Sequence, residues 1–304
     1  MPLPPQLVGP SARRRPGFPW VAPTWPTGVE RPPVSRGLGA DFETDWARAP
    51  AARVARELVL NAVIRPAVNV VATPAVAGLD RLVGAEPPVI FVANHASHLD
   101  APLLLTSVPE RFRRRMAVAG AADYFFDRRL KGVISALALG AVPIERTSVS
   151  RRSLHSLEEL IEDDWSVIIF PEGGRTPDGW GREFKAGAAY LATKAAVPVV
   201  PVHIQDSRLV WRKGGRIRRA PTAVTFGTPV QPGGTLSDAR ALARAMEVAV
   251  EVLADEQVSD WWSARRRAAA GTTPPLRGPA AGVWRRSWAL GDARRQASGP
   301  RWPR

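Results

Sequence analysis

Two of the four histidines in this chain, His95 and His98, lie three residues apart in the stretch VIFVANHASHLD, which ends with Asp100. The apolar run before them has the composition of a buried strand. An imidazole beside a carboxylate can act as a general base, because the carboxylate fixes the tautomer and stabilises the protonated ring. The other ring nitrogen can then take a proton from a substrate hydroxyl. The stretch therefore indicates a candidate acid–base pair of His95 and Asp100.

The geometry of this pair depends on where the following helix begins. On a continuous helix, five residues correspond to about 140° around the axis, so His95 and Asp100 would not face each other. If His95 lies in the turn and the helix begins near Ser97, Asp100 can fold back beneath the imidazole. The alternative is structural, because Ser97 and Asp100 also have the spacing of a capping box. A helix start between the histidines turns His98 away, so we expect His98 behind the site or on the surface.

Two other chemistries compete for this stretch. The pattern H-x-x-H-x-D is similar to the H-x-H-x-D-H clusters of binuclear metallohydrolases, but its spacing differs and Ala101 follows the aspartate. Only His155 and His203 remain as nitrogen ligands, and His155 falls inside a predicted helix, so we predict no metal. A nucleophilic Ser97 would lack the G-x-S-x-G turn. The absence of cysteine excludes a thiol nucleophile and a thiolate metal cluster.

Two later stretches also place polar residues directly after predicted strands. GAVPIERT, residues 140–147, ends with Glu145 and Arg146, and an arginine there is by itself usually a solvated side chain. PEGGRTPDGWGREFKAG, residues 171–187, follows the apolar run SVIIF. Because ligands gather at the carboxyl ends of parallel strands, we expect all three stretches to meet at one site.

The third stretch has the composition of an anion site. Gly173 and Gly174 can expose backbone N–H groups, and Arg175 offers a rigid fork of donors. Together with Arg146 and Lys185, Arg175 could surround a phosphate monoester. The alternative is that the glycines only form a turn and that Arg175 pairs with the neighbouring Glu172.

The elements that must position these residues alternate along the chain. The helical segments are predicted at 42–60, 99–108, 122–138, 149–163, 185–196 and 236–258. Short apolar runs predict strands at 88–93, 115–120, 141–145, 166–170, 197–204 and 222–227. Several of these runs are continuous rather than alternating, which is typical of strands covered on both faces. The pattern predicts an α/β fold with a mostly parallel central sheet flanked by helices.

The formal net charge of +14 is concentrated at the two ends of the chain. Residues 1–36 carry ten prolines and five arginines, and residues 261–304 carry ten arginines and several tryptophans. We expect both ends to be irregular arms. Residues 37–260 hold 27 basic and 26 acidic side chains, so the body is nearly neutral. The arms could serve a basic binding module, but neither resembles a folded nucleic-acid reader, and we predict no nucleic-acid partner.

Residues 58–79 form an apolar segment that is interrupted by polar residues and prolines. A membrane-spanning helix needs roughly 20 consecutive apolar residues, so we expect an interfacial or packed helical region instead. The N-terminus has no apolar core typical of a signal peptide.

Taken in order, these blocks resemble the glycerolipid acyltransferase family, which includes the lysophosphatidic acid acyltransferases. The resemblance spans about residues 80–230, and the arms fall outside it. The matching residues, in the blocks N-H-x-x-x-x-D, G…R, F-P-E-G-x-R-[ST] and FKAG, are Asn94, His95, Ser97, Asp100, Gly140, Arg146, Phe170, Pro171, Glu172, Gly173, Arg175, Thr176, Lys185 and Gly187. Gly174 stands where the family usually has threonine or serine, so the shape of the acceptor pocket is expected to differ from that of the family there.

The resemblance implies transfer of a fatty acyl group from acyl-CoA or acyl-carrier protein to the free hydroxyl of a lysophospholipid, with 1-acylglycerol-3-phosphate as the expected acceptor. Another lysolipid or glycerol-3-phosphate is the alternative within the family. His95 would be the general base and Asp100 its orienting acid, and the other matched residues would bind substrate. A thioester is already reactive, so no metal or cofactor is required beyond the co-substrate.

These expectations define a domain plan and a location. We predict an irregular arm at 1–36, a helical region at 37–80 that contacts the membrane, the acyltransferase domain at 81–260 and a basic tail at 261–304. Because a lysolipid acceptor resides in a bilayer, we expect a peripheral or monotopic protein on the cytoplasmic face of the cell membrane, in contact with anionic lipids.

Overall fold

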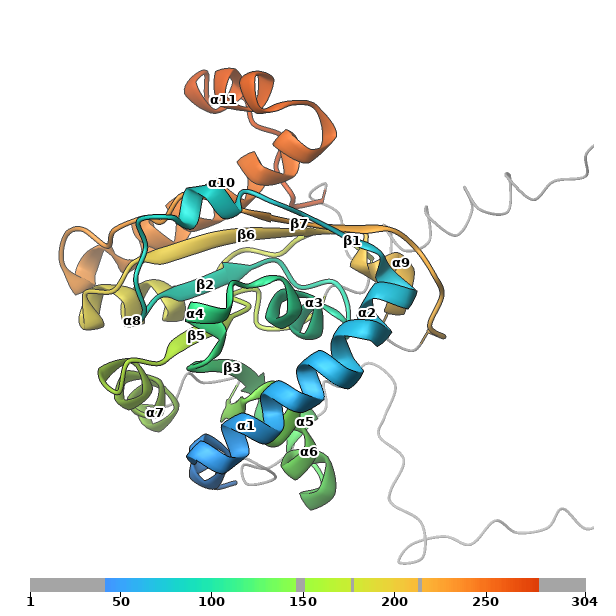
Figure 1. The fold of residues 1–304 in the computed structure, drawn as a ribbon. Coiled ribbons are helices and arrows are strands. Elements are labelled where there is room, and N and C mark those ends of the chain that lie inside the picture. The colour runs from blue at the N-terminus through green and yellow to red at the C-terminus, as the bar shows by residue number, and fades with distance from the viewer. Residues whose placement is uncertain (1–41, 146–150, 176–177, 213–214, 279–304) are drawn as a thin grey trace, which may run out of the picture. The chain divides into compact units, whose positions relative to one another are not determined.

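A computed structural model describes residues 42–145, 151–175, 178–212 and 215–278, with side chains from residue 154 onward in the second range. A seven-stranded sheet forms its centre (Figure 1). The strands are β1 (Pro74–Ala77), β2 (Ile90–Ala93), β3 (Met116–Ala121), β4 (Ala141–Ile144), β5 (Ser166–Ile169), β6 (Val199–Gln205) and β7 (Thr222–Phe226). Their spatial order is β1-β7-β6-β2-β5-β3-β4. Every neighbouring pair is parallel except β6 and β7, which are antiparallel.

Helices connect the strands. The α-helices are α1 (Pro50–Val59), α2 (Arg65–Ala72), α3 (Asp100–Ser107), α4 (Glu110–Arg113), α5 (Ala122–Phe125), α6 (Arg129–Leu139), α7 (Arg151–Glu162), α8 (Gly187–Ala195), α9 (Ser207–Trp211), α10 (Ala239–Val258) and α11 (Trp261–Ala269). A π-helical turn, η2 (Leu60–Ile64), joins α1 and α2, and short 3₁₀ turns are η1 (Asp45–Arg48), η3 (Leu79–Leu82) and η4 (Leu236–Asp238).

The continuous apolar strands are explained by a core on each face of the sheet. Along β2, Phe91 packs into the core beneath α2, α3 and α4, whereas Ile90 and Val92 pack into the core beneath α7, α8 and α10. Successive side chains of a strand point to opposite faces, so a strand buried on both faces needs apolar residues at every position. The predicted α/β class with a mostly parallel sheet is confirmed.

Several stretches differ from the sequence-based expectation, among them the predicted helix at 122–138, which is divided into α5 and α6. Residues 74–77, expected within a helical region, form the edge strand β1 beside β7. Thr73 takes a left-handed conformation (φ 39°) and Pro74 cannot continue a helix, so α2 ends there, and proline is tolerated in an edge strand. Residues 261–269, expected to be irregular, form α11, where Asp260 caps the helix by accepting from Ser263 N–H at 2.9 Å. Residues 1–36 and 279–304 of the two predicted arms lie outside the described residues.

A buried arginine fastens α1 to α6. The Arg56 guanidinium donates to the carbonyl oxygens of Ala136 (3.1 Å) and Leu137 (2.9 Å), at the C-terminal end of α6. Gly140 ends α6 in the left-handed region (φ 64°), where a Cβ would lie 2.8 Å from Met116 O. Burial lowers the pKa of Arg56 to about 10, which still leaves it charged near neutral pH.

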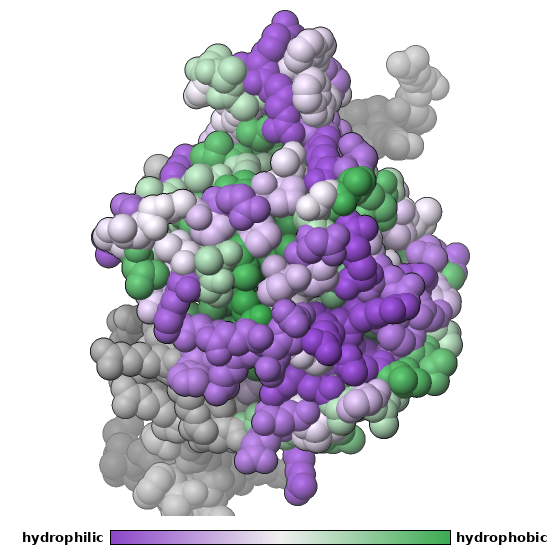
Figure 2. All heavy atoms as spheres, turned by 60° about the vertical axis from the view of Figure 1, so that its left-hand side comes forward, coloured by the Kyte–Doolittle hydropathy of each residue, from purple (hydrophilic) through white to green (hydrophobic). Residues whose placement is uncertain are grey.

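The helices that cover the sheet also determine how hydrophilic the outer surface is. On the side of α7 and α8, the face in Figure 2 is largely hydrophilic, with smaller hydrophobic patches between polar side chains. This is the usual result when helices turn their apolar stripe to the sheet. Among the described residues, every helix falls short of the length and apolarity needed to cross a bilayer.

Candidate active site

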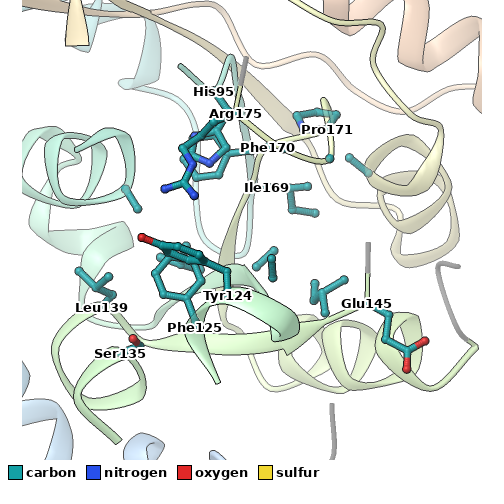
Figure 3. Close-up of a pocket in the computed structure, with 18 of the residues that line it drawn as sticks. His95, Tyr124, Phe125, Ser135, Leu139, Glu145, Ile169, Phe170, Pro171 and Arg175 are labelled. Atoms are coloured by element: carbon teal, nitrogen blue, oxygen red, sulfur yellow. The ribbon is translucent and has the colours of Figure 1, made fainter. Parts of the chain in front are cut away.

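The site lies where the carboxyl ends of β2, β5, β3 and β4 meet, because these neighbouring strands are parallel. A cavity of about 330 Å³ opens there, and Figure 3 shows part of its wall. The wall is mostly apolar, and its polar and charged side chains are His95, His98, Tyr124, Lys131, Ser135, Glu145, Arg175, Lys185 and Trp211.

The structure brings His95 and Asp100 into direct contact. His95 Nδ1 lies 2.8 Å from Asp100 Oδ2, and the same oxygen accepts from the backbone N–H groups of Ala96 and Ser97, each at 2.8 Å. The Asp100 side chain is 0% exposed and that of His95 is 16% exposed. Three converging donors fix the carboxylate, and the carboxylate fixes the imidazole with its proton on Nδ1. Nε2 is left as the nitrogen available to a substrate.

α3 starts at Asp100, three residues after Ser97 and one residue after the start of the predicted helix 99–108. Only one half of the capping box forms, because Ser97 N–H donates to Asp100 Oδ2 but the Ser97 hydroxyl does not accept from Asp100 N–H. Instead, the Ser97 hydroxyl donates to Trp211 O at 2.7 Å and accepts from Leu99 N–H at 3.0 Å. The non-helical turn at 94–99 is what allows the Asp100 side chain to reach back to His95. A regular helix through this stretch would have separated the two side chains.

Asn94 fastens this turn to the sheet. Its amide donates to Ile204 O at 2.9 Å and accepts from Ile204 N–H at 2.8 Å, so it pairs with β6 as a strand would. Neither Asn94 nor Ser97 contributes to the cavity wall, so the contacts of both are structural. They hold the backbone on either side of His95.

The Glu172 side chain also holds this turn, through a hydrogen bond to its backbone. Its Oε1 accepts from His95 N–H at 3.0 Å, and Oε2 is buried without a hydrogen-bond partner among the described residues. Burial raises the pKa of Glu172 to about 8, and the nearby Asp100 carboxylate contributes in the same direction. The expected alternative pairing with Arg175 does not form in the described residues, because Glu172 bonds to the His95 backbone instead.

The loop after β5 supplies the opposite wall. Phe170 stacks on the His95 ring, with centroids 4.3 Å apart and an interplanar angle of 23°. Gly173 has a left-handed conformation (φ 68°), and a Cβ there would lie 2.8 Å from Lys185 Nζ. The missing side chain therefore lets the lysine lie over the loop. Pro171, Gly174 and Gly187 complete this wall of the cavity.

His98 lines the cavity, contrary to the expectation that it would lie behind the site or on the surface. Its Nδ1 lies 2.6 Å from Tyr124 Oη, and Arg175 Nη1 contacts the same nitrogen. Burial, followed by the nearby positive charge of Arg175, lowers the pKa of His98 to about 4. The late helix start explains the difference, since His98 still belongs to the turn and not to the helix.

The remaining predicted site residues do not all line the cavity. Gly140 is not part of the cavity wall and serves as the end of α6. Arg146 and Thr176 lie outside the described residues. Sequence reasoning missed Tyr124, Lys131 and Trp211, which reach the cavity from α5, α6 and α9. Tyr124 follows the end of β3, so the rule that ligands gather at strand ends could have indicated it.

Within the described ranges, no three histidine, aspartate or glutamate side chains gather where they could hold a metal ion.

Comparisons with known proteins agree with this architecture. The Acyltransferase family model matches residues 74–205. The chain is 32% identical over 146 residues to a 1-acyl-sn-glycerol-3-phosphate acyltransferase of Limnanthes alba, covering 46% of this chain and 50% of the relative. It is 36% identical over 120 residues to 1-acyl-sn-glycerol-3-phosphate acyltransferase beta of Homo sapiens, covering 38% of this chain and 40% of the relative. The chain thus spans about half the length, or less, of these curated relatives.

A solved structure has the same fold. The crystal structure of the 1-acyl-sn-glycerophosphate (LPA) acyltransferase, PlsC, from Thermotoga maritima superposes with a TM-score of 0.53 at 24% identity, covering 71% of this chain and 84% of that chain. The likeness to this structure concerns the fold, and the match to the Acyltransferase family model concerns residues 74–205. Over the matched segment the chain is similar to 1-acyl-sn-glycerol-3-phosphate acyltransferases.

Proposed function

We propose that this protein is an O-acyltransferase that moves a fatty acyl group from a thioester donor to the free hydroxyl of 1-acylglycerol-3-phosphate. One observation carries the proposal. The His95–Asp100 pair, joined at 2.8 Å, stands at a mostly apolar cavity that also presents Arg175 and Lys185. A base, an apolar volume and fixed cations are the parts that acylation of an anionic lipid requires.

The chemical step is a direct transfer. His95 Nε2 accepts the proton of the acceptor hydroxyl while the hydroxyl oxygen bonds to the thioester carbonyl carbon. Asp100 stabilises the resulting imidazolium. The carbonyl then re-forms, the carbon–sulfur bond breaks, and the departing thiolate takes the proton back from His95. No covalent enzyme intermediate is needed, so the absence of cysteine from the chain is no obstacle.

The cations favour a phosphorylated acceptor. Arg175 offers planar, paired donors suited to a phosphate group, and Lys185 lies over the same loop at Gly173. A lysolipid of another headgroup and glycerol-3-phosphate are the alternatives within the family. For the donor, acyl-CoA and acyl-carrier protein carry the same thioester, and either would act as co-substrate without a further cofactor.

A membrane-bound acceptor requires a surface that meets lipid. Apolar side chains more than half exposed cluster on α1, η2, α2 and α6, of which α1 and α6 pack together. They are Val54, Leu58, Val63, Val70, Leu130 and Ile134. We propose that this apolar surface rests on the cytoplasmic face of the cell membrane as a peripheral or monotopic contact, with anionic lipids drawn to the basic arms.

The test is an acceptor and donor screen with the purified full-length protein in detergent or vesicles. Radiolabelled acyl-CoA and acyl-carrier protein are each offered with 1-acylglycerol-3-phosphate, lysophosphatidylcholine and glycerol-3-phosphate. We expect labelled phosphatidate from the first acceptor and none from the His95→Ala variant. Transfer that survives this substitution would refute the mechanism, and transfer only to another acceptor would correct the substrate.

A further inference from the structure

Arg175 is held by aromatic side chains instead of by a carboxylate. Its guanidinium carbon lies 4.3 Å from the centre of the Tyr124 ring, and its Nη1 also lies 3.1 Å from His98 Nε2. In the described part of the chain, no aspartate or glutamate forms an ion pair with it. Figure 3 shows the guanidinium between the His95–Phe170 pair and Tyr124.

His98 can serve this arginine only as an acceptor. A guanidinium has donors and no acceptor, so an unprotonated ring nitrogen of His98 must face it. Tyr124 Oη lies 2.6 Å from His98 Nδ1, and because a phenol hydroxyl can donate or accept, the contacts fit either neutral tautomer. The low pKa of His98, about 4, keeps the ring neutral near neutral pH.

The histidine ring is itself fixed from behind. It packs against Trp211 at the end of α9, with ring centroids 4.9 Å apart, and His98 N–H donates to Trp211 O at 3.3 Å. Tyr124 is anchored as well, since Lys131 Nζ lies 4.0 Å from its ring centre and contacts Tyr124 O. His98 is thus held by α9, which is remote in sequence, and Tyr124 is held by Lys131 on the following helix α6.

A neutral support has a specific consequence for an anion-binding arginine. A carboxylate partner would hold the guanidinium more strongly, but it would also cancel much of its charge in a partly desolvated cavity. An imidazole lone pair and a phenol face restrict the side chain and leave its positive charge in place. The arginine is then preorganised for an anion without being neutralised.

We propose that His98 and Tyr124 are positioning residues that hold Arg175 ready for the phosphate of the acceptor while leaving its charge uncompensated. The inference rests on the proposed function for the identity of the anion, and extends it to His98, at an unspecified position of the first motif, and to Tyr124, outside the motifs. It assigns to position 98 control over acceptor affinity and leaves the proton transfer to His95.

Substitutions at position 98 separate charge from geometry. His98→Gln keeps a neutral acceptor, His98→Ala removes it, and His98→Asp supplies a charged one. We expect the KM for the phosphorylated acceptor to rise about tenfold in His98→Ala, with kcat changed little, because a charged hydrogen bond is worth roughly 1.5 kcal/mol. His98→Gln should restore most of the affinity. His98→Asp should be at least as impaired as His98→Ala, although it restores an acceptor.

Two controls keep the result interpretable. His155, an exposed histidine on α7, should tolerate alanine without a change in KM. Tyr124→Phe removes the hydroxyl but keeps the ring under Arg175, so its KM should rise less than that of His98→Ala. The KM for the acyl donor should stay constant throughout. An aspartate variant as good as the wild type, or an alanine variant that loses kcat at constant KM, would overturn the proposal.

A binding measurement separates this inference from the proposed function. Glycerol-3-phosphate is titrated calorimetrically into the full-length wild type and each variant, which requires no turnover. An affinity order of wild type, glutamine, alanine and aspartate supports the positioning role even if no acyl transfer is found. Equal affinities in all four proteins contradict it, even if transfer is efficient. Thermal unfolding midpoints close to that of the wild type show that the variants are folded.

Discussion

The carboxyl group of Glu172 accepts a hydrogen bond from the backbone N–H of His95 at 3.0 Å, so a buried acid from the loop after β5 holds the turn that carries the proposed catalytic base. Because burial raises its pKa to about 8, this acid is mostly protonated near neutral pH. The histidine turn after β2 and the glycine loop after β5 are therefore linked directly.

This linkage predicts a pH-dependent stability. Between about pH 4.5 and pH 8 the folded state keeps a proton on Glu172 that the unfolded chain releases, so the unfolding free energy falls progressively as pH rises through this range. Glu172→Gln removes this titration. We expect the unfolding free energy of the variant, relative to wild type, to increase between about pH 5 and pH 8 in denaturant titrations.

The difference in unfolding free energy between Glu172→Gln and wild type reports on Glu172 and excludes the contribution of the buried histidines. His98 and His203 have pKa values lowered to about 4, mainly by burial, so they remove stability as pH falls from 6.5 toward 4 in both proteins. Their contribution cancels in the difference. A difference between variant and wild type that stays flat with pH would show that Glu172 is ionised in the folded protein.

The acid–base pair predicts a large loss of rate without a loss of fold. His95→Ala should lower kcat by roughly 10³–10⁴, because the hydroxyl must then lose its proton to water. Asp100→Asn should lower it to a similar degree, since the imidazolium loses its counter-charge. Single-turnover assays with labelled donor measure the rate, and circular dichroism checks the fold. His155→Ala, on the exposed face of α7, is the matched control.

The cavity wall predicts control of acyl-chain length. Ser135 on α6 is 7% exposed and lines the cavity, on the side of Leu139 and Phe125 in Figure 3. A Ser135→Phe substitution should fill part of the apolar volume and shift donor preference toward shorter acyl chains by about tenfold in relative kcat/KM. The neighbouring Ile134→Phe, at a position 56% exposed, should leave the preference unchanged. An unaltered chain-length profile for Ser135→Phe would place the acyl chain elsewhere.

The apolar surface predicts membrane binding that depends on particular side chains. Leu58 on α1 and Leu130 on α6 are 65% and 72% exposed. We expect Leu58→Glu and Leu130→Glu to weaken association with vesicles containing phosphatidylglycerol by about tenfold each in flotation assays. Val258→Glu, at the end of α10, is the control for a charge added to an exposed apolar position. Equal binding by all three variants would exclude α1 and α6 as the contact.

Several features of the fold could be predicted from local patterns. The continuous apolar runs predicted strands buried on both faces, and the two cores divided by β2 give the reason. The edge strand β1 escaped prediction because its four residues carry no signal of their own beyond Pro74. Pairing with β7, nearly 150 residues later, is what makes them a strand.

The sequence by itself indicated the candidate chemistry, because residue types and their order predict a histidine, a carboxylate and a candidate anion-binding loop at the ends of strands. Only the tertiary structure decided how these parts meet. Two hydrogen bonds hold the turn at 94–99: Asn94 donates to Ile204 O on β6, and Ser97 donates to Trp211 O. Both contacts join segments more than 100 residues apart. The same long-range packing brought His98 and Tyr124 beside Arg175. Local pattern cannot reveal such neighbours, since their proximity is set by sheet order and not by spacing along the chain.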